Sequence, residues 1–183
     1  IKKGNLYSDC YFVFKEVEHT NKNSSYQIGD TNIPIHKGVS ISIKPDHYIN
    51  TNKNKLAIGQ LKNNKWSYIK STWKNDKLKG VAKKFGTFTI IQDQKKPTIK
   101  ATNLKENMKN EKSIKFKVRD NFSGINYYNA TLNGEWVILE YDAKNNLLEH
   151  FFHGDTTNKN QKLTLTVKDG LGNENKQEFY FKR

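Results

Sequence analysis

The sequence predicts an all-β protein made of two consecutive β-sandwich modules, residues 1–94 and 95–183. Apolar and polar residues alternate with a period of two over short runs, which is typical of strands buried on one face. Asn, Asp and Gly recur between these runs, where tight hairpins need positive φ angles. The 183 residues also suit two domains of roughly 90 residues, a size at which a domain can fold alone.

The first module contains five strand-like runs. In GVSISIKP, three branched residues alternate with polar ones, and Pro45 ends the run because proline cannot donate to a ladder. Two asparagines at 63 and 64 predict a hairpin before KWSYIKSTW, which we interpret as one strand. The expected strands lie within 10–17, 38–45, 55–61, 65–73 and 80–93.

The segment QDQKKPT, 92–98, combines charge with a proline, so the domain boundary is expected near residue 94. Seven short runs at about ten-residue spacing follow, and that count predicts an immunoglobulin-like sandwich with about seven strands. The stretch GEWVILEYD is interpreted as one middle strand of a meander. The seven runs are PTIKATNL, SIKFKVRD, GINYYNATL, EWVILEYD, LLEHFF, KLTLTVKD and KQEFYFKR.

Three turns of the second module carry residues whose role is expected to be turn-structuring. Asp120 and Asp169 each follow a valine near a strand end and precede a glycine, Gly124 or Gly172, so their carboxylates can accept backbone N–H groups. Asn133 and Gly134 form the favoured pair for a type I′ hairpin. A calcium ion would suit such loops, but each loop offers only one aspartate as a ligand. We therefore predict no metal and no cofactor.

The charge favours a basic surface over a nucleic-acid site. The net charge is +14, with 32 lysines and arginines against 18 acidic residues, yet arginine, which suits bidentate contacts to phosphate and guanine, is almost absent. This pattern therefore disfavours nucleic acid as a partner. No window of the sequence has the roughly 18 apolar residues of a membrane helix. The single Cys10 excludes an internal disulfide framework.

The best ligand-binding candidates are Trp66, Tyr68, Lys70 and Trp73, because aromatic rings beside lysines can stack on an acidic glycan or on bases. The alternative is that these aromatics anchor the core. The best candidate for an enzymatic site is a catalytic pair formed by Glu140 and Glu149 across the 142–146 turn. Charges on the solvated face of a hairpin produce the same pattern, so we interpret the chain as non-catalytic.

The runs KKPTIKATNL, RDNFSGINYYNATLNGEWVILEYDAKNNLLEHFF and LTLTVKDGLGNENKQEFYF resemble the C-terminal, non-catalytic all-β region of lysostaphin/LytM-type zinc metallopeptidases of the bacterial envelope. IPIHKGVSISIKP (33–45) and KKFGTFTIIQDQKKPTI (83–99) are similar to the segments that precede this region. The zinc motif of that class, H-x-x-x-D with a later H-x-H, is missing from this sequence.

The resemblance implies an exported accessory region, at the periplasm, outer surface or extracellular space, that positions or anchors a neighbouring enzyme. Its partners would be peptidoglycan or another envelope polysaccharide, or an upstream catalytic domain. Two alternatives stay open on the residues alone: a carbohydrate-binding or adhesive module with its own ligand, and a structural spacer that docks another protein.

Overall fold

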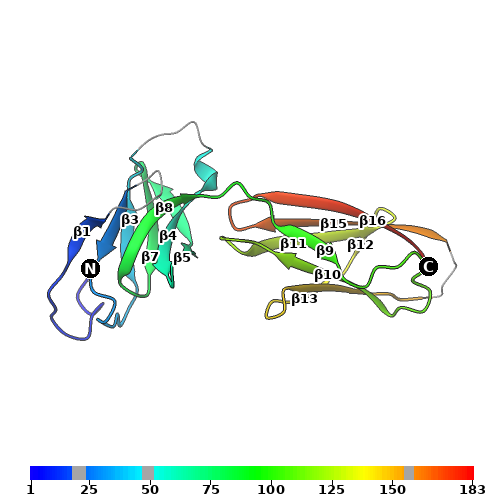
Figure 1. Ribbon diagram of the computed structural model, residues 1–183, viewed down its shortest axis with the longest axis horizontal. Coiled ribbons are helices and arrows are strands. Elements are labelled where there is room, and N and C mark those ends of the chain that lie inside the picture. The colour runs from blue at the N-terminus through cyan, green and yellow to red at the C-terminus, as the bar shows by residue number, and fades with distance from the viewer. Residues whose placement is uncertain (18–23, 47–51, 155–158) are drawn as a thin grey trace. The chain divides into compact units, whose positions relative to one another are not determined.

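A computed structural model describes residues 1–17, 24–46, 52–154 and 159–183. The chain divides into two compact units, Ile1–Gln94 and Lys95–Arg183 (Figure 1). In the described residues every regular element is a strand except one short 3-10 helix, η1, at Lys53–Lys55, and the prediction of an all-β chain with β-sandwich modules is confirmed. No helix within these described ranges has the length and apolar character needed to cross a bilayer.

The first unit is a sandwich of two antiparallel sheets of unequal size. One sheet has the order β1-β2-β8-β4-β5 and the other the order β3-β7-β6. Their inward side chains, among them Ile41, Leu78 and Phe88, form one buried core. The strands are β1 (Phe14–Val17), β2 (Ser25–Ile28), β3 (Val39–Ile43), β4 (Leu56–Lys62), β5 (Lys65–Ile69), β6 (Ser71–Lys74), β7 (Lys77–Ala82) and β8 (Gly86–Gln92).

The run expected as one strand over 65–73 is two strands in different sheets, so that expectation is wrong. β5 pairs with β4, whereas β6 pairs with β7 in the opposite sheet. At the crossing, the Ser71 hydroxyl donates to the Ile69 carbonyl at 2.6 Å and accepts the Ile58 amide at 3.0 Å. This side chain supplies hydrogen bonds where the chain leaves one ladder for the other, and the inward alternation of Ile69 and Trp73 continues through the crossing.

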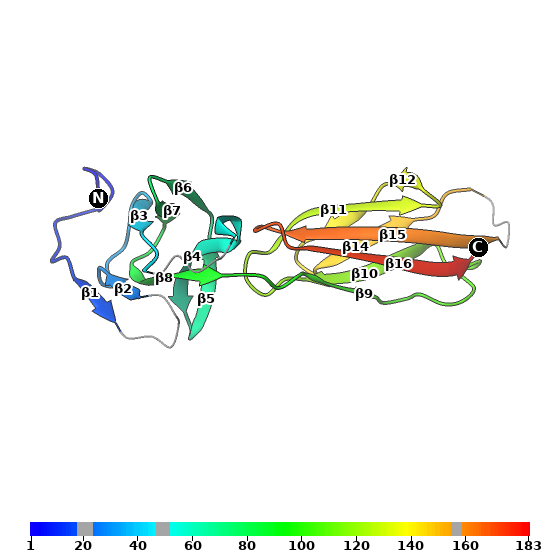
Figure 2. The ribbon, with the colours of Figure 1, turned by 90° about the horizontal axis from the view of Figure 1, so that it is seen from above.

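The second unit is a sandwich with the strand order of an immunoglobulin domain. The two sheets have the orders β13-β14-β10-β9 and β12-β11-β15-β16, which correspond to D-E-B-A and C′-C-F-G. Figure 2 shows β11, β15 and β16 running side by side along this unit. The strands are β9 (Thr98–Ala101), β10 (Ser113–Arg119), β11 (Ile125–Leu132), β12 (Glu135–Val137), β13 (Glu140–Asp142), β14 (Leu147–Phe151), β15 (Asn160–Asp169) and β16 (Glu174–Lys182).

The described residues of this unit therefore form eight strands where about seven were expected, because the stretch EWVILEYD is two strands and not one. β12 pairs with β11 in one sheet, and β13 pairs with β14 in the other. The alternation persists across the switch, since Val137, Leu139 and Tyr141 all face the core while Trp136 and Ile138 are exposed. A strand that passes between the layers of a sandwich keeps its apolar side inward in both, so the sequence pattern does not reveal the break.

Candidate binding surfaces

The structure does not bring the predicted ligand-binding residues together on one surface. Trp66 and Tyr68 lie half-buried on β5, opposite Leu61 and Gly59 of β4. Trp73 lies on β6 in the other sheet and packs against the core. Its indole N–H donates to the Lys53 carbonyl at 2.9 Å, and the Lys53 ammonium lies 5.3 Å from the ring centroid. Lys70 is exposed at the crossing between β5 and β6.

Two of the turn residues act through their carboxylates. Asp120 Oδ2 accepts the amide N–H of Phe122 at 3.0 Å and that of Gly124 at 2.8 Å. Gly124 has a φ of 74°, in the left-handed region that favours glycine. These hydrogen bonds organise the chain between β10 and β11.

The turn after β15 repeats this arrangement in a more buried setting. Asp169 is buried, and its Oδ1 accepts the amides of Leu171 at 2.9 Å and Asn173 at 2.8 Å. Asn173 Nδ2 donates to Asp169 Oδ2 at 2.6 Å, and Gly172 has a φ of 73°. A carboxylate oxygen of Asp169 lies within 4.8 Å of one from Asp120, so the two turns are neighbours at one end of the unit.

Asn133 and Gly134 form a two-residue connection between β11 and β12, with φ angles of 53° and 92°. Both angles are positive, as a type I′ turn requires. The Asn133 side chain also joins the neighbouring strand, because its Oδ1 accepts the Lys162 amide at 2.9 Å and its Nδ2 donates to Gln161 Oε1 at 2.6 Å. The turn therefore fixes the end of β11 against the first residues of β15.

The most exposed aromatic surface of the second unit is the outer face of the sheet β12-β11-β15-β16. Trp136, Tyr127 and Tyr180 are 68%, 46% and 62% exposed. Trp136 is paired with Thr131, which is paired in turn with Thr164. We call this surface the aromatic face; it comprises Trp136, Thr131, Asn129, Tyr127, Thr164, Thr166, Lys162, Lys168, Glu174, Lys176, Glu178 and Tyr180.

Lysines lie beside two of the three rings. The Lys162 ammonium lies 5.8 Å from the centroid of Tyr180, and 2.7 Å from a carboxylate oxygen of Glu178. The Tyr180 hydroxyl donates to the other oxygen of Glu178 at 2.6 Å. Hydrogen bonds to Glu178 raise the pKa of both Lys162 and Tyr180 above their ordinary values. The charged ammonium of Lys162 and the protonated hydroxyl of Tyr180 are thereby favoured at neutral pH.

A similar group lies farther along the sheet. Lys168 is paired with Tyr127, and its ammonium lies 5.6 Å from that ring and 2.8 Å from Glu174. The hydrogen bond to Glu174 raises the pKa of Lys168. Lys168 lies six positions after Lys162 on β15, which is roughly 20 Å along an antiparallel strand. Aromatic faces, hydroxyls and ammonium groups therefore spread over an extended, rigid surface.

This surface can bind a ligand with planar apolar faces and polar edges. The C–H faces of sugar rings pack on aromatic rings, while threonine, asparagine and lysine side chains can meet hydroxyl and carboxylate groups. The ligand site predicted from the sequence concerns other residues, Trp66, Tyr68, Lys70 and Trp73. Trp66 and Trp136 each stand at an alternating position of a strand that follows a turn. How far each ring is exposed depends on what packs over it in the folded chain, and the neighbouring sequence does not show this.

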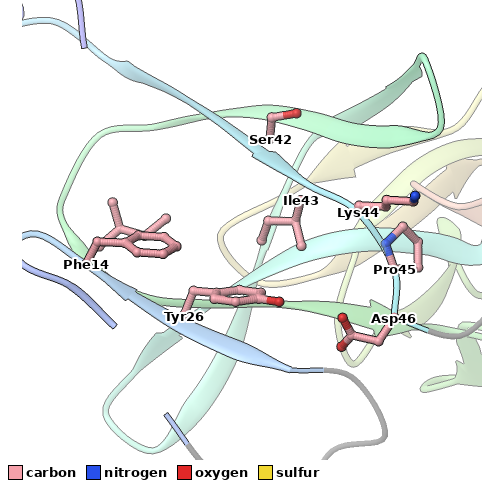
Figure 3. Close-up of a pocket in the computed structure, with 8 residues that line it drawn as sticks. Phe14, Tyr26, Ser42, Ile43, Lys44, Pro45 and Asp46 are labelled. Atoms are coloured by element: carbon pink, nitrogen blue, oxygen red, sulfur yellow. The ribbon is translucent and has the colours of Figure 1, made fainter. Parts of the chain in front are cut away.

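A groove lies in the first unit between the inner face of β1 and β2 and the end of β3 (Figure 3). Its volume is about 470 Å³. Phe14 and Tyr26 form one wall, with ring centroids 6.0 Å apart and planes inclined by 10°. The lining residues are Phe14, Tyr26, Ile28, Ser42, Ile43, Lys44, Pro45 and Asp46.

Both charged residues of the groove come from the segment after β3. Asp46 Oδ2 accepts the Ser24 amide at 2.6 Å, which ties this segment to the start of β2. In Figure 3 the Asp46 carboxylate lies on the same side as the Tyr26 hydroxyl, and the Lys44 side chain extends away from the aromatic wall. The groove thus combines an apolar wall with polar groups at one end.

Comparison with known proteins gives a structural likeness to solved proteins and a match to a family model. The spore cortex lytic enzyme SleM of Clostridium perfringens is similar at a TM-score of 0.31 and 13% identity, over 64% of this chain and 38% of that chain. The chain thus spans well under half of SleM, and so low a score carries no functional argument. No curated protein matches the chain. Residues 1–93, just over half of the sequence, match the Zu5-like domain, and the chain therefore belongs to the Zu5-like domain family.

Proposed function

We propose that the chain is a non-catalytic accessory region of an exported protein and holds that protein against an envelope polysaccharide. The observation that carries the proposal is the aromatic face of the second unit. Trp136, Tyr127 and Tyr180 are exposed together on one sheet whose strands are fixed by continuous antiparallel pairing. A preformed site of this kind loses little conformational entropy when it binds an extended polymer.

The composition of the aromatic face suits a polysaccharide better than a folded protein partner. Between the rings lie Thr131, Thr164 and Thr166, which offer hydroxyl donors and acceptors without a large apolar area. Protein interfaces usually have an apolar centre from which charges are depleted, whereas Lys162 and Lys168 here lie directly against the tyrosine rings.

The non-catalytic part of the proposal is supported by the environment of the best carboxylate pair. Glu140 and Glu149 are direct neighbours on β13 and β14. Glu149 accepts the Ser113 hydroxyl at 2.5 Å and lies 3.4 Å from the Lys115 ammonium. The Glu149 carboxylate is thus engaged by a hydroxyl and an ammonium of its own sheet, whereas a general acid must reach the leaving group of a substrate.

The finer identity of the parent protein rests on the resemblance of the sequence to the accessory region of lysostaphin/LytM-type metallopeptidases. In that setting the polysaccharide would be peptidoglycan, and a catalytic domain elsewhere in the parent protein would act on the wall that this region binds. The basic surface, +14 overall, would favour a wall that carries anionic groups.

The test is a pelleting assay with insoluble peptidoglycan, at low salt and at about 0.5 M salt, where the Debye length is only about 4–5 Å. We expect the chain to bind at both salt concentrations and to release no soluble fragments. Trp136→Ala should weaken binding by roughly tenfold, because stacked aromatic side chains contribute about 1–3 kcal/mol each. Phe151→Ala is the matched control, since Phe151 is 38% exposed on the other sheet of the same unit.

Binding that disappears at high salt would mean that the charge alone attracts the wall, and the proposed role of the aromatic face would be wrong. Equal loss of binding in Trp136→Ala and Phe151→Ala would also contradict it. Release of soluble muropeptides by the purified chain would refute the non-catalytic assignment.

A further inference from the structure

The groove of the first unit follows from the unequal size of its two sheets. In the part of this unit that the structure describes, the larger sheet has five strands and the smaller one has three. β1 and β2 lie at the end of the larger sheet, and their inward residues Phe14, Tyr26 and Ile28 line the groove beside β3. Phe14 is 65% exposed although it is paired with Ile28 and shares its face of the sheet. Among the described residues no strand of the smaller sheet covers this part of the apolar face.

Within the described residues, the strand beside the groove, β3, is an edge strand. It pairs with β7 on one side and has no described strand on the other. Edge strands are usually protected by charged residues, prolines or bulges, but the outward side chains of β3 are Ser40 and Ser42, and its register with β7 is regular. The backbone groups that point away from β7 can therefore receive another strand.

The chain itself shows where this free edge begins. Leu6 forms an isolated antiparallel bridge with Ile35, just before β3. Asn5 accepts the amides of His36 and Lys37 at its carbonyl, and its side chain donates to the Gly38 carbonyl at 2.8 Å. Pro45 follows β3 at the other end. The accessible edge is thus the length of β3, five residues or roughly 17 Å.

We propose that this groove is a strand-accepting site for an extended, acidic peptide segment of another protein. The segment would pair with the free edge of β3 and would place alternate apolar side chains on Phe14, Tyr26 and Ile28. It would complete the smaller sheet where the larger sheet projects beyond it. This mode of recognition joins main-chain hydrogen bonds for affinity with alternating side-chain contacts for specificity.

The expected chemistry of the peptide follows from the charge and the strand geometry. Residues 1–94 contain 16 lysines against seven acidic residues, a net charge of +9, so an acidic partner is attracted and a basic one repelled. Successive side chains of a strand point to opposite faces. Every second residue of the peptide should therefore be a β-branched or aromatic residue that faces Phe14 and Tyr26. The residues between them should be acidic and solvated.

The test uses a short synthetic peptide in which glutamate and valine alternate, with a fluorescent label, and measures its binding to the full chain by anisotropy. Two control peptides carry lysine in place of glutamate, or proline in place of the central valine. We expect saturable binding of the acidic peptide alone, because proline removes a ladder donor and lysine reverses the charge.

Two matched pairs of variants locate the site. Phe14→Ala should weaken binding roughly fivefold or more, as loss of a ring from the contact area typically does, whereas Tyr11→Ala should not, because Tyr11 is 97% exposed and lies outside the groove. Lys44→Glu should weaken binding more than Lys65→Glu, which changes an exposed lysine on the far edge strand, β5, by the same charge. All four side chains are exposed, so the variants should fold.

Equal binding of the three peptides, no binding of the acidic peptide, or equal effects within either variant pair would overturn the proposal. Sedimentation of the chain as a dimer that Phe14→Ala dissociates would assign the groove to a second copy instead, and would overturn it as well. The outcome is independent of the polysaccharide proposal, because that proposal concerns Trp136 in the other unit and a different ligand.

Discussion

Removing the Asp169 carboxylate should destabilise the second unit far more than removing the equivalent group at Asp120. In Asp169→Ala, the amides of Leu171 and Asn173 and the Asn173 side chain lose a buried, charged acceptor. Hydrogen bonds to charged groups contribute about 1.5–3 kcal/mol each. Since water can reach part of a hairpin turn after the substitution, we expect a net loss of about 3 kcal/mol in the free energy of unfolding.

Asp120 provides the internal comparison. It accepts two amides in a half-buried turn, so Asp120→Ala should cost only about 1 kcal/mol. Hydrogen exchange of core amides in β15 and β16 reports the unfolding of this unit alone. A loss of 3 kcal/mol corresponds to about a hundredfold faster exchange. Exchange in Asp169→Ala within a factor of about two of the parent chain would refute the reasoning.

Two further substitutions test local packing and pH dependence. Gly29→Ala should lower thermal stability by several degrees, because Gly29 has a φ of 66° and a Cβ there would lie 2.5 Å from the Phe85 ring; Gly4→Ala, at a φ of 81° with open space around it, should cost much less, and equal costs would contradict the packing argument. Burial lowers the pKa of His150 from its ordinary 6.5, so the folded state binds fewer protons than the unfolded chain and stability should fall as the pH drops below about 6.5. His150→Gln should flatten urea-unfolding stability between pH 7 and 5 while keeping a donor for the Ile138 carbonyl, 3.0 Å away; an unchanged slope would contradict the assignment.

Much of the fold could be predicted from the sequence because its strands alternate regularly and its turns have distinct residues. The runs SIKFKVRD and KLTLTVKD both lie on long strands, and the asparagine pair at 63 and 64 does have positive φ angles of 48° and 59°. β2, SYQI, was not identified, since its buried Ser25 interrupts the apolar pattern.

The binding surfaces were harder to predict than the strands. Whether Trp66 or Trp136 is exposed depends on which strands lie beside each and on what packs over them. Both rings are on edge strands, β5 and β12, but Trp66 lies over Gly59, where a Cβ would be 3.4 Å from the indole, whereas Trp136 is 68% exposed. The groove depends on a difference in strand number between two sheets. That difference is a property of long-range pairing, and no window of the sequence contains it.

Because the chain passes directly from β12 to β13, the strand register in one sheet of the second unit depends on the register in the other. Only Ile138 and Leu139 separate these strands, which pair with β11 in one sheet and β14 in the other. A one-residue slip of β12 would turn its side chains to the wrong face and would also pull β13 out of its own pairing. Short edge strands shift easily out of register. Here a shift of either strand would also disrupt the pairing of the other, so a register error in one sheet destabilises both sheets.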